Sequence, residues 1–246
     1  LGAKVECIHC SPDGKNINLN CGSQHVESLR ARVLESGADV GIAFDGDADR
    51  AIFVSHSGQT VDGDAVLLVC GVRMGVKEVV ATVMSNLGLE RALKRHGIGM
   101  LRTPVGDKYV LEEMVRRSLP LGGEQSGHVI FRDYATTGDG LLTALRVCEA
   151  MRASGQDLDA LTAELETYPQ RLVNVRVKER RPLEDLATVT AEIRRTEAEF
   201  GDRGRVVVRF SGTEPLARVM VEGPHLDRVE HFAESIAAAI RSELGS

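Results

Sequence analysis

The stretch FDGDADR, at positions 44–50, places three aspartates at alternate positions and an arginine directly after the last one. Asp45, Asp47 and Asp49 would repel one another unless a cation neutralised them. The apolar run DVGIAF before them predicts a strand, so the carboxylates fall on a strand-end loop, where Gly46 permits a sharp turn. Carboxylate oxygens that leave coordination positions open for a phosphate oxygen suit Mg²⁺. The pattern therefore predicts a magnesium site used in phosphate chemistry.

Other readings of this stretch can be compared with the sequence. An EF-hand loop beginning at Asp45 would need glycine at its sixth position and glutamate at its twelfth, where this chain has Arg50 and His56. A haloacid-dehalogenase-type phosphatase also begins with apolar residues and D-x-D, but it leaves the third aspartate and Arg50 unexplained. An acidic solvated loop without a ligand stays open as the simplest alternative.

A second group of residues lies in RFSGTEPLAR, between two apolar runs that predict strands. Gly212 permits an unusual backbone conformation, and Ser211 and Thr213 present hydroxyls beside exposed amide donors. Arg209 and Arg218 add guanidinium groups that bind phosphate through paired hydrogen bonds. The segment predicts a phosphate-binding loop, and an ordinary hairpin turn with surface arginines is the alternative.

The third segment is GGEQSGH, a polar loop flanked by glycines. If the segment is extended, Glu124, Ser126 and His128 point to one side, because alternate side chains of a strand share a face. Glutamate and serine suit sugar hydroxyls or an amine, and histidine suits a phosphate or an oxygen near the reacting centre. Taken alone, this segment also fits a polar loop without function.

These segments must be held by an α/β framework. From position 3 to position 55, short apolar runs (AKVECIH, DVGIAF, AIFVS) predict strands around one amphipathic helix, HVESLRARVLES. From position 60 to position 153, strand and helix patterns alternate, which predicts mainly parallel sheets covered by helices. Beyond the Tyr168-Pro169 linker, one strand, a helix, two strands and a final helix predict a small α+β domain. The expected domains are 1–59, 60–167 and 168–246.

The composition sets limits on partners and location. The chain has 246 residues with a formal net charge of -6, so nucleic acid is not an expected partner. An uninterrupted apolar stretch long enough to cross a membrane is absent, as is a signal segment at the start, and a cytoplasmic protein is expected. Five scattered cysteines suit a reducing compartment, although Cys7 and Cys10 have a C-x-x-C spacing.

The segments together resemble a known family. FDGDADR, GGEQSGH, TTGDG and RFSGTEPLARVMVEG occur in the order typical of the α-D-phosphohexomutase superfamily. VMSNLGLE, PVGDKYVLE and TTGDGLLTAL bring the resemblance close to its bacterial phosphoglucosamine mutase branch. The resemblance runs from Ser11 to the C-terminus.

The resemblance implies an enzyme that interconverts glucosamine 6-phosphate and glucosamine 1-phosphate, on the route to UDP-N-acetylglucosamine. A phosphoserine donates its phosphoryl group, and a bisphosphate intermediate turns over in the site. The resemblance implies that Asp45, Asp47 and Asp49 hold Mg²⁺, and that Arg50 and His128 are catalytic residues. It implies that Glu124, Ser126 and Lys108 bind the substrate. The phosphate that is not transferred would be bound by Arg209, Ser211, Gly212, Thr213 and Arg218.

One part of the family pattern is missing. The family's phosphoserine lies in a Ser-His-Asn-Pro type loop, and no such loop occurs in these 246 residues. The chain is therefore expected to be a C-terminal portion with part of a second domain, a complete third domain and the last domain, and to show no mutase turnover alone. A phosphomannomutase/phosphoglucomutase portion and a non-catalytic sugar-phosphate-binding module are the alternatives. An exposed sheet edge in the partial domain predicts possible homo-oligomers.

Overall fold

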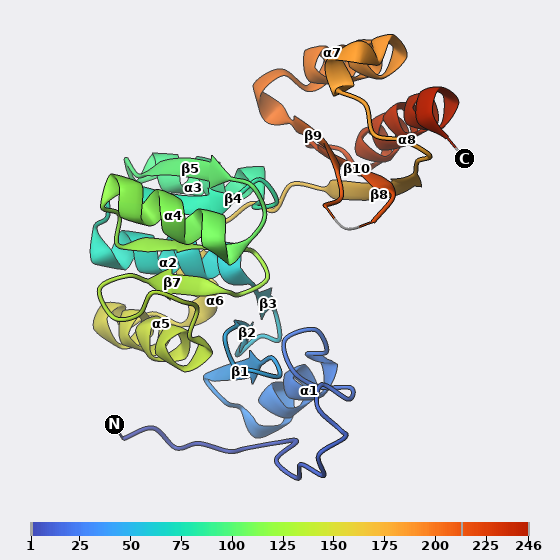
Figure 1. Cartoon of the computed structure of the whole chain (residues 1–246). Helices are drawn as coiled ribbons and strands as arrows, with labels where there is room; N and C mark the ends of the chain where they lie inside the picture. Colours follow the sequence, from blue (N-terminus) through green and yellow to red (C-terminus); the bar gives the residue numbers. More distant parts are fainter. Residues whose placement is uncertain (1, 213, 246) are drawn as a thin grey trace. The chain divides into compact units, whose positions relative to one another are not determined.

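The computed structural model describes residues 2–212 and 214–245. It divides into two compact units (Figure 1). The first unit comprises Leu1–Ser85 and Leu89–Glu166, and the second comprises Asn86–Gly88 and Thr167–Ser246. No helix among the described residues has the length and apolar character that crossing a bilayer requires.

The N-terminal part of the first unit is an antiparallel sheet with one helix packed on it. Its three strands have the order β1-β2-β3, and Phe44 at the end of β1 pairs with Ala51 at the start of β2. Residues 3–9, which the sequence predicts to be a strand, form none and are mostly exposed, because no described strand accepts their backbone hydrogen bonds. The elements are α1 (Glu27–Ser36), β1 (Val40–Phe44), β2 (Ala51–Ser55) and β3 (Thr60–Val61).

The rest of the first unit is built on a four-stranded sheet of order β5-β4-β6-β7. β4 is parallel to both β5 and β6, and only β7 is antiparallel to its neighbour. The elements are α2 (Gly63–Met74), β4 (Glu78–Thr82), α3 (Leu87–Arg95), β5 (Gly99–Thr103), α4 (Asp107–Arg117), β6 (Leu121–Gly123), β7 (Val129–Phe131), α5 (Gly140–Ser154) and α6 (Leu158–Thr162).

Strand periodicity explains why both faces of this sheet are covered. Val79 and Ala81 of β4 pack into the large core with α2, α3 and α5, whereas Val80 between them packs with Val110 and Met114 of α4. Alternate side chains of a strand point to opposite faces, so a strand with consecutive apolar residues at its centre needs helices on both sides. Figure 1 shows α4 on one side of the sheet and α2 on the other.

The buried cysteine of α2 gives a direct test of this core. Cys70 is 2% exposed, and burial raises the pKa of its thiol to about 12. Cys7 and Cys10 are exposed. Because the thiolate is the reactive form, we expect iodoacetamide at about pH 8 to modify Cys7 and Cys10 in the folded chain and to leave Cys70 unmodified. Peptide mass spectrometry measures this, with urea-unfolded chain as the control. Equal alkylation of Cys70 and Cys7 in the folded chain would contradict the assignment of Cys70 to the core.

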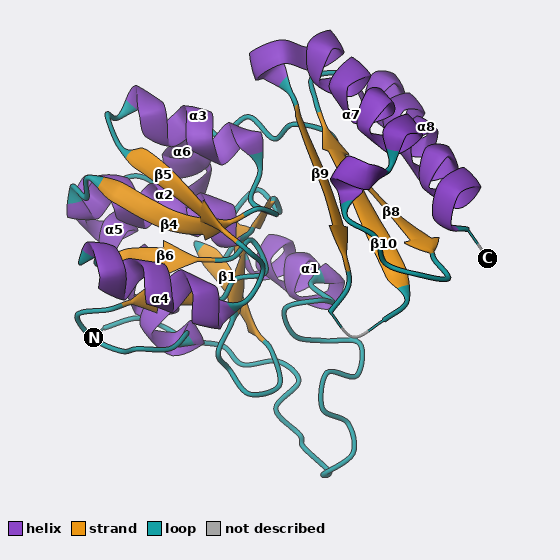
Figure 2. Ribbon diagram, turned by 45° about the horizontal axis from the view of Figure 1, so that its top comes forward, coloured by secondary structure: helices purple, strands orange, loops and turns teal. Residues whose placement is uncertain are grey.

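The second unit is the small α+β domain that the sequence predicts. Its three strands are antiparallel in the order β8-β10-β9, and Figure 2 shows α7 and α8 together on one face of this sheet. The core includes Val219 of β10, Phe232 and Ile236 of α8 and Val189 of α7. The elements are β8 (Gln170–Arg176), α7 (Ala187–Phe200), β9 (Arg205–Phe210), β10 (Leu216–Glu222) and α8 (Leu226–Leu244). The predicted fold class, α/β followed by α+β, is confirmed.

A buried polar network lies at the end of β10. The Glu222 side chain is fully buried, and its Oε2 accepts from Arg205 Nη2 (2.8 Å) and Nε (3.0 Å). Its Oε1 accepts from the Leu87 N–H (3.0 Å). Beside it, the Asn86 side chain donates to the Tyr168 carbonyl and accepts from the Tyr168 N–H, both at 3.0 Å. This network explains why residues 86–88 belong to the second unit.

Candidate metal and sugar-phosphate site

The three aspartates lie in the loop that joins β1 to β2. The Ala48 N–H donates to the Asp45 carbonyl (3.1 Å), and Ala48 has the left-handed φ of 59° that closes this turn. The Arg50 N–H donates to Asp45 Oδ1 (3.1 Å), which fixes the far end of the loop. As a result, one oxygen from each of Asp45, Asp47 and Asp49 lies within 4.8 Å of the other two.

The electrostatics of this loop fit a divalent cation. Burial raises the pKa of Asp49, and a hydrogen bond and the negative charge of Asp45 raise it further. Asp49 Oδ1 is buried and has no hydrogen-bond partner among the described residues. The contacts of Arg50 with these carboxylates are long, since its Nε lies 3.6 Å from Asp45 and 3.7 Å from Asp49. A buried carboxylate oxygen without a partner, among crowded carboxylates, is the environment that Mg²⁺ would stabilise.

Two other loops of the same unit contact the loop of residues 45–50, which is called the metal loop below after the cation site that the sequence predicts. The backbone of Arg50 forms an antiparallel bridge with His128. The Gly140 N–H, from the TTGDG segment, donates to the Ala48 carbonyl (2.9 Å). The Gly138 N–H donates to His128 Nε2 (3.2 Å). Three segments that are distant in the sequence therefore meet at the aspartates.

The GGEQSGH segment is a tight turn between β6 and β7. The Gly127 N–H donates to the Glu124 carbonyl (3.0 Å), and Gly127 has a φ of 96°. The predicted placement of Glu124, Ser126 and His128 on one side is therefore wrong, because a turn breaks the alternation of a strand. Ser126 is exposed, whereas His128 is 4% exposed and faces Asp49, with Nε2 3.5 Å from Asp49 Oδ2.

Glu124 and Ser126 line a pocket of about 420 Å³. Glu124 Oε1 accepts from the Gly106 N–H (3.0 Å), which ties the turn to the loop before α4. Lys108, in the first turn of α4, has a side chain that is 75% exposed, lies 3.8 Å from Glu112 and does not line this pocket. The lining residues are Asp62, Thr82, Met84, Val105, Glu124, Gln125 and Ser126.

Asp62 in this pocket was not singled out in the sequence. Its carboxylate accepts from the N–H groups of Asp64 and Ala65 and so caps α2. Burial raises its pKa, and hydrogen bonds from Ala65 and Gln125 oppose that shift. The signal in the sequence was VDGD before an apolar helix, which is a helix-capping pattern. Asp62 therefore orders α2 and holds Gln125 of the turn.

A second pocket, of about 400 Å³, opens directly on the metal loop. Its far wall comes from the segment INLNCGSQH, in which Asn18 and Asn20 have positive φ angles. In the sequence, this segment shows only the Asn- and Gly-rich pattern that is typical of turns. The lining residues are Ile17, Asn18, Cys21, Ser23, Gln24, His25, Asp45, Gly46, Asp47 and Arg50.

In the second unit, Arg209 and Arg218 are paired residues on neighbouring strands. Burial lowers the pKa of Arg209, and the positive charge of Arg218 lowers it further. Arg218 Nη2 donates to Glu214 (2.8 Å), so this guanidinium already has one carboxylate partner. An anion placed beside this pair would relieve the repulsion.

The loop between β9 and β10 is shaped by its own hydrogen bonds. Ser211 is 4% exposed, and its Oγ accepts from the Glu214 N–H (3.2 Å). Arg180, which the sequence did not indicate, donates to the carbonyls of Glu214 (3.0 Å) and Gly212 (3.4 Å). Thr213 lies outside the described residues. The structure thus brings Asp45, Asp47, Asp49, Arg50 and His128 together in the first unit, and Arg209, Ser211, Gly212 and Arg218 together in the second.

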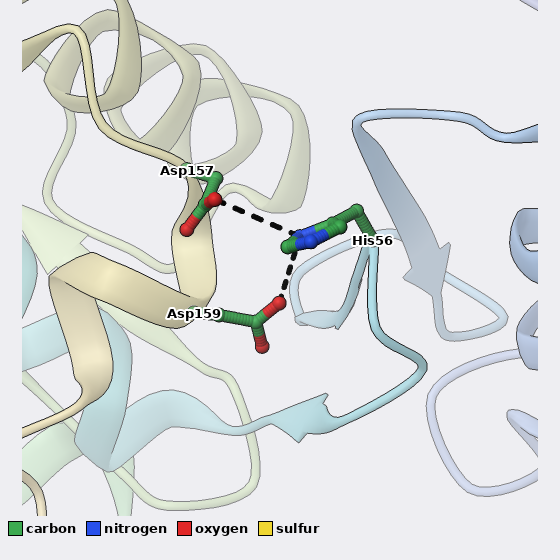
Figure 3. Close-up of side chains that lie close together, drawn as sticks. All are labelled: His56, Asp157 and Asp159. Carbon is green, nitrogen blue, oxygen red and sulfur yellow. Dashed lines mark ion pairs between the residues drawn. The ribbon is translucent and has the colours of Figure 1, made fainter.

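A separate charged cluster links the β2–β3 turn to α6 (Figure 3). His56 Nδ1 lies 2.7 Å from Asp159 and 3.9 Å from Asp157, and the Ser57 hydroxyl donates to Asp159 (2.9 Å). Burial alone would raise the pKa of Asp159, but hydrogen bonds from Ser55 and Ser57 and the charge of His56 outweigh it and lower the pKa. Because these partners satisfy Asp159, the cluster is a structural link.

Removing this link should loosen the β2–β3 turn. We expect Asp159→Asn to speed amide hydrogen exchange at residues 55–59 near pH 7, because the contacts of the carboxylate with the Ser57 hydroxyl and His56 Nδ1 are weakened. A lowered pKa in the folded state gives stability that is present above the unfolded pKa and is lost as pH falls through the folded value. The difference between the variant and the parent should therefore disappear in strong acid. Exchange rates that match at pH 7 would contradict this link; Asp157→Asn is the matched control, with a smaller expected effect because its contact with His56 is longer.

Comparisons with known proteins show which family this chain belongs to. The family described as phosphoglucomutase/phosphomannomutase, alpha/beta/alpha domain III, matches residues 62–168, and the C-terminal domain of the same family matches residues 172–239. Phosphoglucosamine mutase of Solibacter usitatus is 64% identical over 100% of this chain and 56% of its own length. Phosphoglucosamine mutase of Koribacter versatilis is 51% identical over 100% of this chain and 55% of its own length. The chain spans about half the length of these relatives.

Solved structures show the same fold at low identity. N-acetylphosphoglucosamine mutase of Aspergillus fumigatus, in complex with GlcNAc-6P and magnesium, has a TM-score of 0.74 and 22% identity over 92% of this chain and 53% of that chain. A phosphoglucomutase/phosphomannomutase family protein from Burkholderia thailandensis has a TM-score of 0.73 and 22% identity over 89% of this chain and 50% of that chain.

Proposed function

Since the chain belongs to the phosphoglucomutase/phosphomannomutase family, we propose that it is the C-terminal portion of a phosphoglucosamine mutase. The whole enzyme would interconvert glucosamine 6-phosphate and glucosamine 1-phosphate through a phosphoserine and a bisphosphate intermediate, in the cytoplasm, to supply UDP-N-acetylglucosamine synthesis. The observation that carries this proposal is the convergence of the Asp45, Asp47 and Asp49 carboxylates, with Asp49 Oδ1 buried and without a partner among the described residues.

The metal loop supplies charge stabilisation at one end of the substrate. Asp45, Asp47 and Asp49 would hold Mg²⁺, which when bound neutralises the negative charge of a transferring phosphoryl group. Arg50 contributes a fixed positive charge beside Asp45 and Asp49. Phosphoryl transfer needs mainly positioning and charge neutralisation, and a loop tied to two neighbouring segments by backbone hydrogen bonds provides the first of these.

Glu124 and Ser126 would contact the sugar from the pocket that they line. One oxygen of the Glu124 carboxylate holds the Gly106 N–H, so the other is oriented to accept from a hydroxyl or to pair with the 2-ammonium group of glucosamine. Lys108 lies on the helix that follows Gly106, and the same hydrogen bond sets the start of that helix. This arrangement supports an amino-sugar phosphate as the substrate class.

The second unit would bind the phosphate that is not transferred. Arg209 and Arg218 supply two guanidinium groups, and Ser211 and Arg180 shape the loop that also contains Gly212 and Thr213. We expect Arg209→Met to weaken glucosamine 6-phosphate binding about 10-fold or more, because a hydrogen bond between charged groups contributes about 1.5–3 kcal/mol. Lys178→Met, at an exposed position in the same unit, is the control and should leave binding unchanged.

The decisive experiment has two stages. The 246-residue chain is first assayed for Mn²⁺ binding and for mutase turnover with glucosamine 6-phosphate, Mg²⁺ and a hexose bisphosphate. Metal binding that is lost in Asp47→Asn, with no turnover and no phosphate on the chain by intact mass, supports the proposal. The longer protein that carries the serine loop should then turn over glucosamine 6-phosphate in preference to mannose and glucose phosphates.

Other outcomes point to the alternatives. A preference for mannose or glucose phosphate would assign the chain to a phosphomannomutase/phosphoglucomutase. Binding of sugar phosphate by the longer protein without turnover would indicate a binding module. Phosphorylation of a serine within these residues, with turnover, would show that the nucleophile lies in this chain.

A further inference from the structure

The imidazole ring of His128 is buried and is held by a backbone hydrogen bond. Its side chain is 5% exposed, and Nδ1 is buried without a hydrogen-bond partner among the described residues. Its Nε2 accepts from the Gly138 N–H at 3.2 Å. The Gly138 N–H therefore fixes the position of Nε2 and, with it, the orientation of the imidazole ring.

The same ring lies against a metal-loop carboxylate. His128 Nε2 is 3.5 Å from Asp49 Oδ2, which is beyond hydrogen-bond distance while Nε2 is accepting from Gly138. The ring therefore limits the rotation of the Asp49 carboxylate without using one of its lone pairs. Asp49 Oδ1, buried and without a partner among the described residues, stays available to a cation.

Gly138 is placed so that no side chain fits between these groups. A Cβ added there would lie 2.5 Å from His128 Cδ2 and Nε2 and 2.7 Å from the Asp49 carbonyl. The φ of Gly138 is not in the left-handed region, so the requirement for glycine at this position is one of space. Gly138 and His128 are thus packed against each other and against Asp49.

We propose that His128 is a positioning residue for Asp49: Gly138 fixes the imidazole ring, and the ring holds the Asp49 carboxylate toward the cation. This inference rests on the proposed metal site at Asp45, Asp47 and Asp49. His128 then acts through a metal ligand, in the way that second-sphere partners of metal ligands set ligand orientation. The TTGDG segment contributes to the same positioning through Gly138, although it lies about 90 residues after the metal loop in the sequence.

The test uses the 246-residue chain and Mn²⁺, whose free ion is quantified by electron paramagnetic resonance. His128→Phe keeps a ring of similar size but removes the acceptor for Gly138, and we expect Mn²⁺ affinity to fall about 10-fold or more. His128→Gln restores an acceptor near the Nε2 position, and its affinity should stay within about 3-fold of the parent chain. His225→Phe and His225→Gln, at an exposed position in the second unit, are matched controls.

A second readout distinguishes positioning from a general effect on folding. The Gly138 amide resonance in ¹H–¹⁵N spectra should shift in His128→Phe, which lacks the acceptor, and stay near its parent position in His128→Gln. Circular dichroism reports whether each variant folds. If His128→Phe does not fold, Gly138→Ala replaces it, and the same loss of Mn²⁺ affinity is expected because its Cβ displaces the ring.

The outcomes are separable. Parent-like Mn²⁺ affinity in folded His128→Phe, or in Gly138→Ala, overturns the positioning role and leaves the proposed metal site intact. A Gly138 amide resonance that is unchanged in His128→Phe overturns it as well. A parent chain that binds no Mn²⁺ contradicts the proposed metal site, and the inference with it.

Discussion

Replacing Glu222 with alanine is expected to lower the free energy of unfolding of the second unit by about 3–5 kcal/mol, as is typical when one partner of a buried ion pair is removed. The carboxylate is fully buried, receives two hydrogen bonds from Arg205 and accepts from the Leu87 N–H. Its loss leaves a buried backbone donor without this acceptor. Urea unfolding followed by circular dichroism gives the free energy, and hydrogen exchange at β9, β10 and α8 assigns the loss to the second unit.

Two controls define what this result means. Glu199→Ala breaks an ion pair with Arg228 at the surface of the same unit, and we expect a loss of about 1 kcal/mol or less. Glu222→Gln keeps an acceptor for Leu87 but removes the charge, so its stability should lie between those of the parent and Glu222→Ala. If Glu222→Ala and Glu199→Ala had equal effects, the buried network would have no special role in the second unit.

Replacing Gly63 with alanine is expected to displace the GGEQSGH turn, the proposed sugar-binding segment, and to destabilise the first unit by about 1–3 kcal/mol, the usual cost of overpacking. A Cβ at this position would lie 2.0 Å from the Glu124 carbonyl oxygen and 2.9 Å from the Gly127 nitrogen. Both are backbone atoms, so no side-chain rotation relieves the clash. The Gly63 N–H also donates to the Gln125 carbonyl (3.0 Å), a bond that the displacement would break.

The consequence for function is a loss of sugar-phosphate affinity, which we expect to be about 10-fold or more, because Glu124 and Ser126 move with the turn. Isothermal titration with glucosamine 6-phosphate and thermal melts measure the two effects. Gly71→Ala is the control, since it lies in the same helix and its Cβ would make only side-chain contacts at 3.3 Å or longer. Alanine is a better helix former than glycine, so this control should be neutral or stabilising. Parent-like binding by Gly63→Ala would show that the turn adapts.

The sequence predicted those parts of the fold that depend on local pattern. DVGIAF and AIFVS are strands β1 and β2, and the alternation of strands and helices after them gives the four-stranded sheet. The sequence also placed Asp45, Asp47 and Asp49 on a loop after a strand, since the apolar run ends at Phe44. Residues 3–9 failed as a strand, because strand patterns form strands only where a neighbour completes the hydrogen bonds.

The sequence predicted the position of a site residue where its own segment determines that position, and it did not predict contacts between segments. The turn in GGEQSGH depends on a hydrogen bond from the Gly127 N–H to the Glu124 carbonyl. A glycine-rich segment between two strand patterns is compatible with a turn and with one continuous strand, so the sequence pattern does not distinguish the two. The roles of Asp62 and Arg180 depend on contacts with residues far along the chain. The contact between Gly138 and His128 crosses from one loop to another, so no spacing rule applied to a single motif reveals it.

The left-handed backbone of Ala48 has a consequence for how quickly a cation enters. A residue with a side chain pays a free-energy penalty in this conformation, of the order of 1 kcal/mol, and the hydrogen bonds to Asp45 and from Gly140 hold it there. Hydrogen bonds within the protein therefore hold the loop around its carboxylates, and we expect the proposed cation site to need no reordering of this backbone when Mg²⁺ binds. Since Mg²⁺ gives up its water molecules slowly, the association rate should be set by water exchange on the ion and should be the same at high and low solvent viscosity.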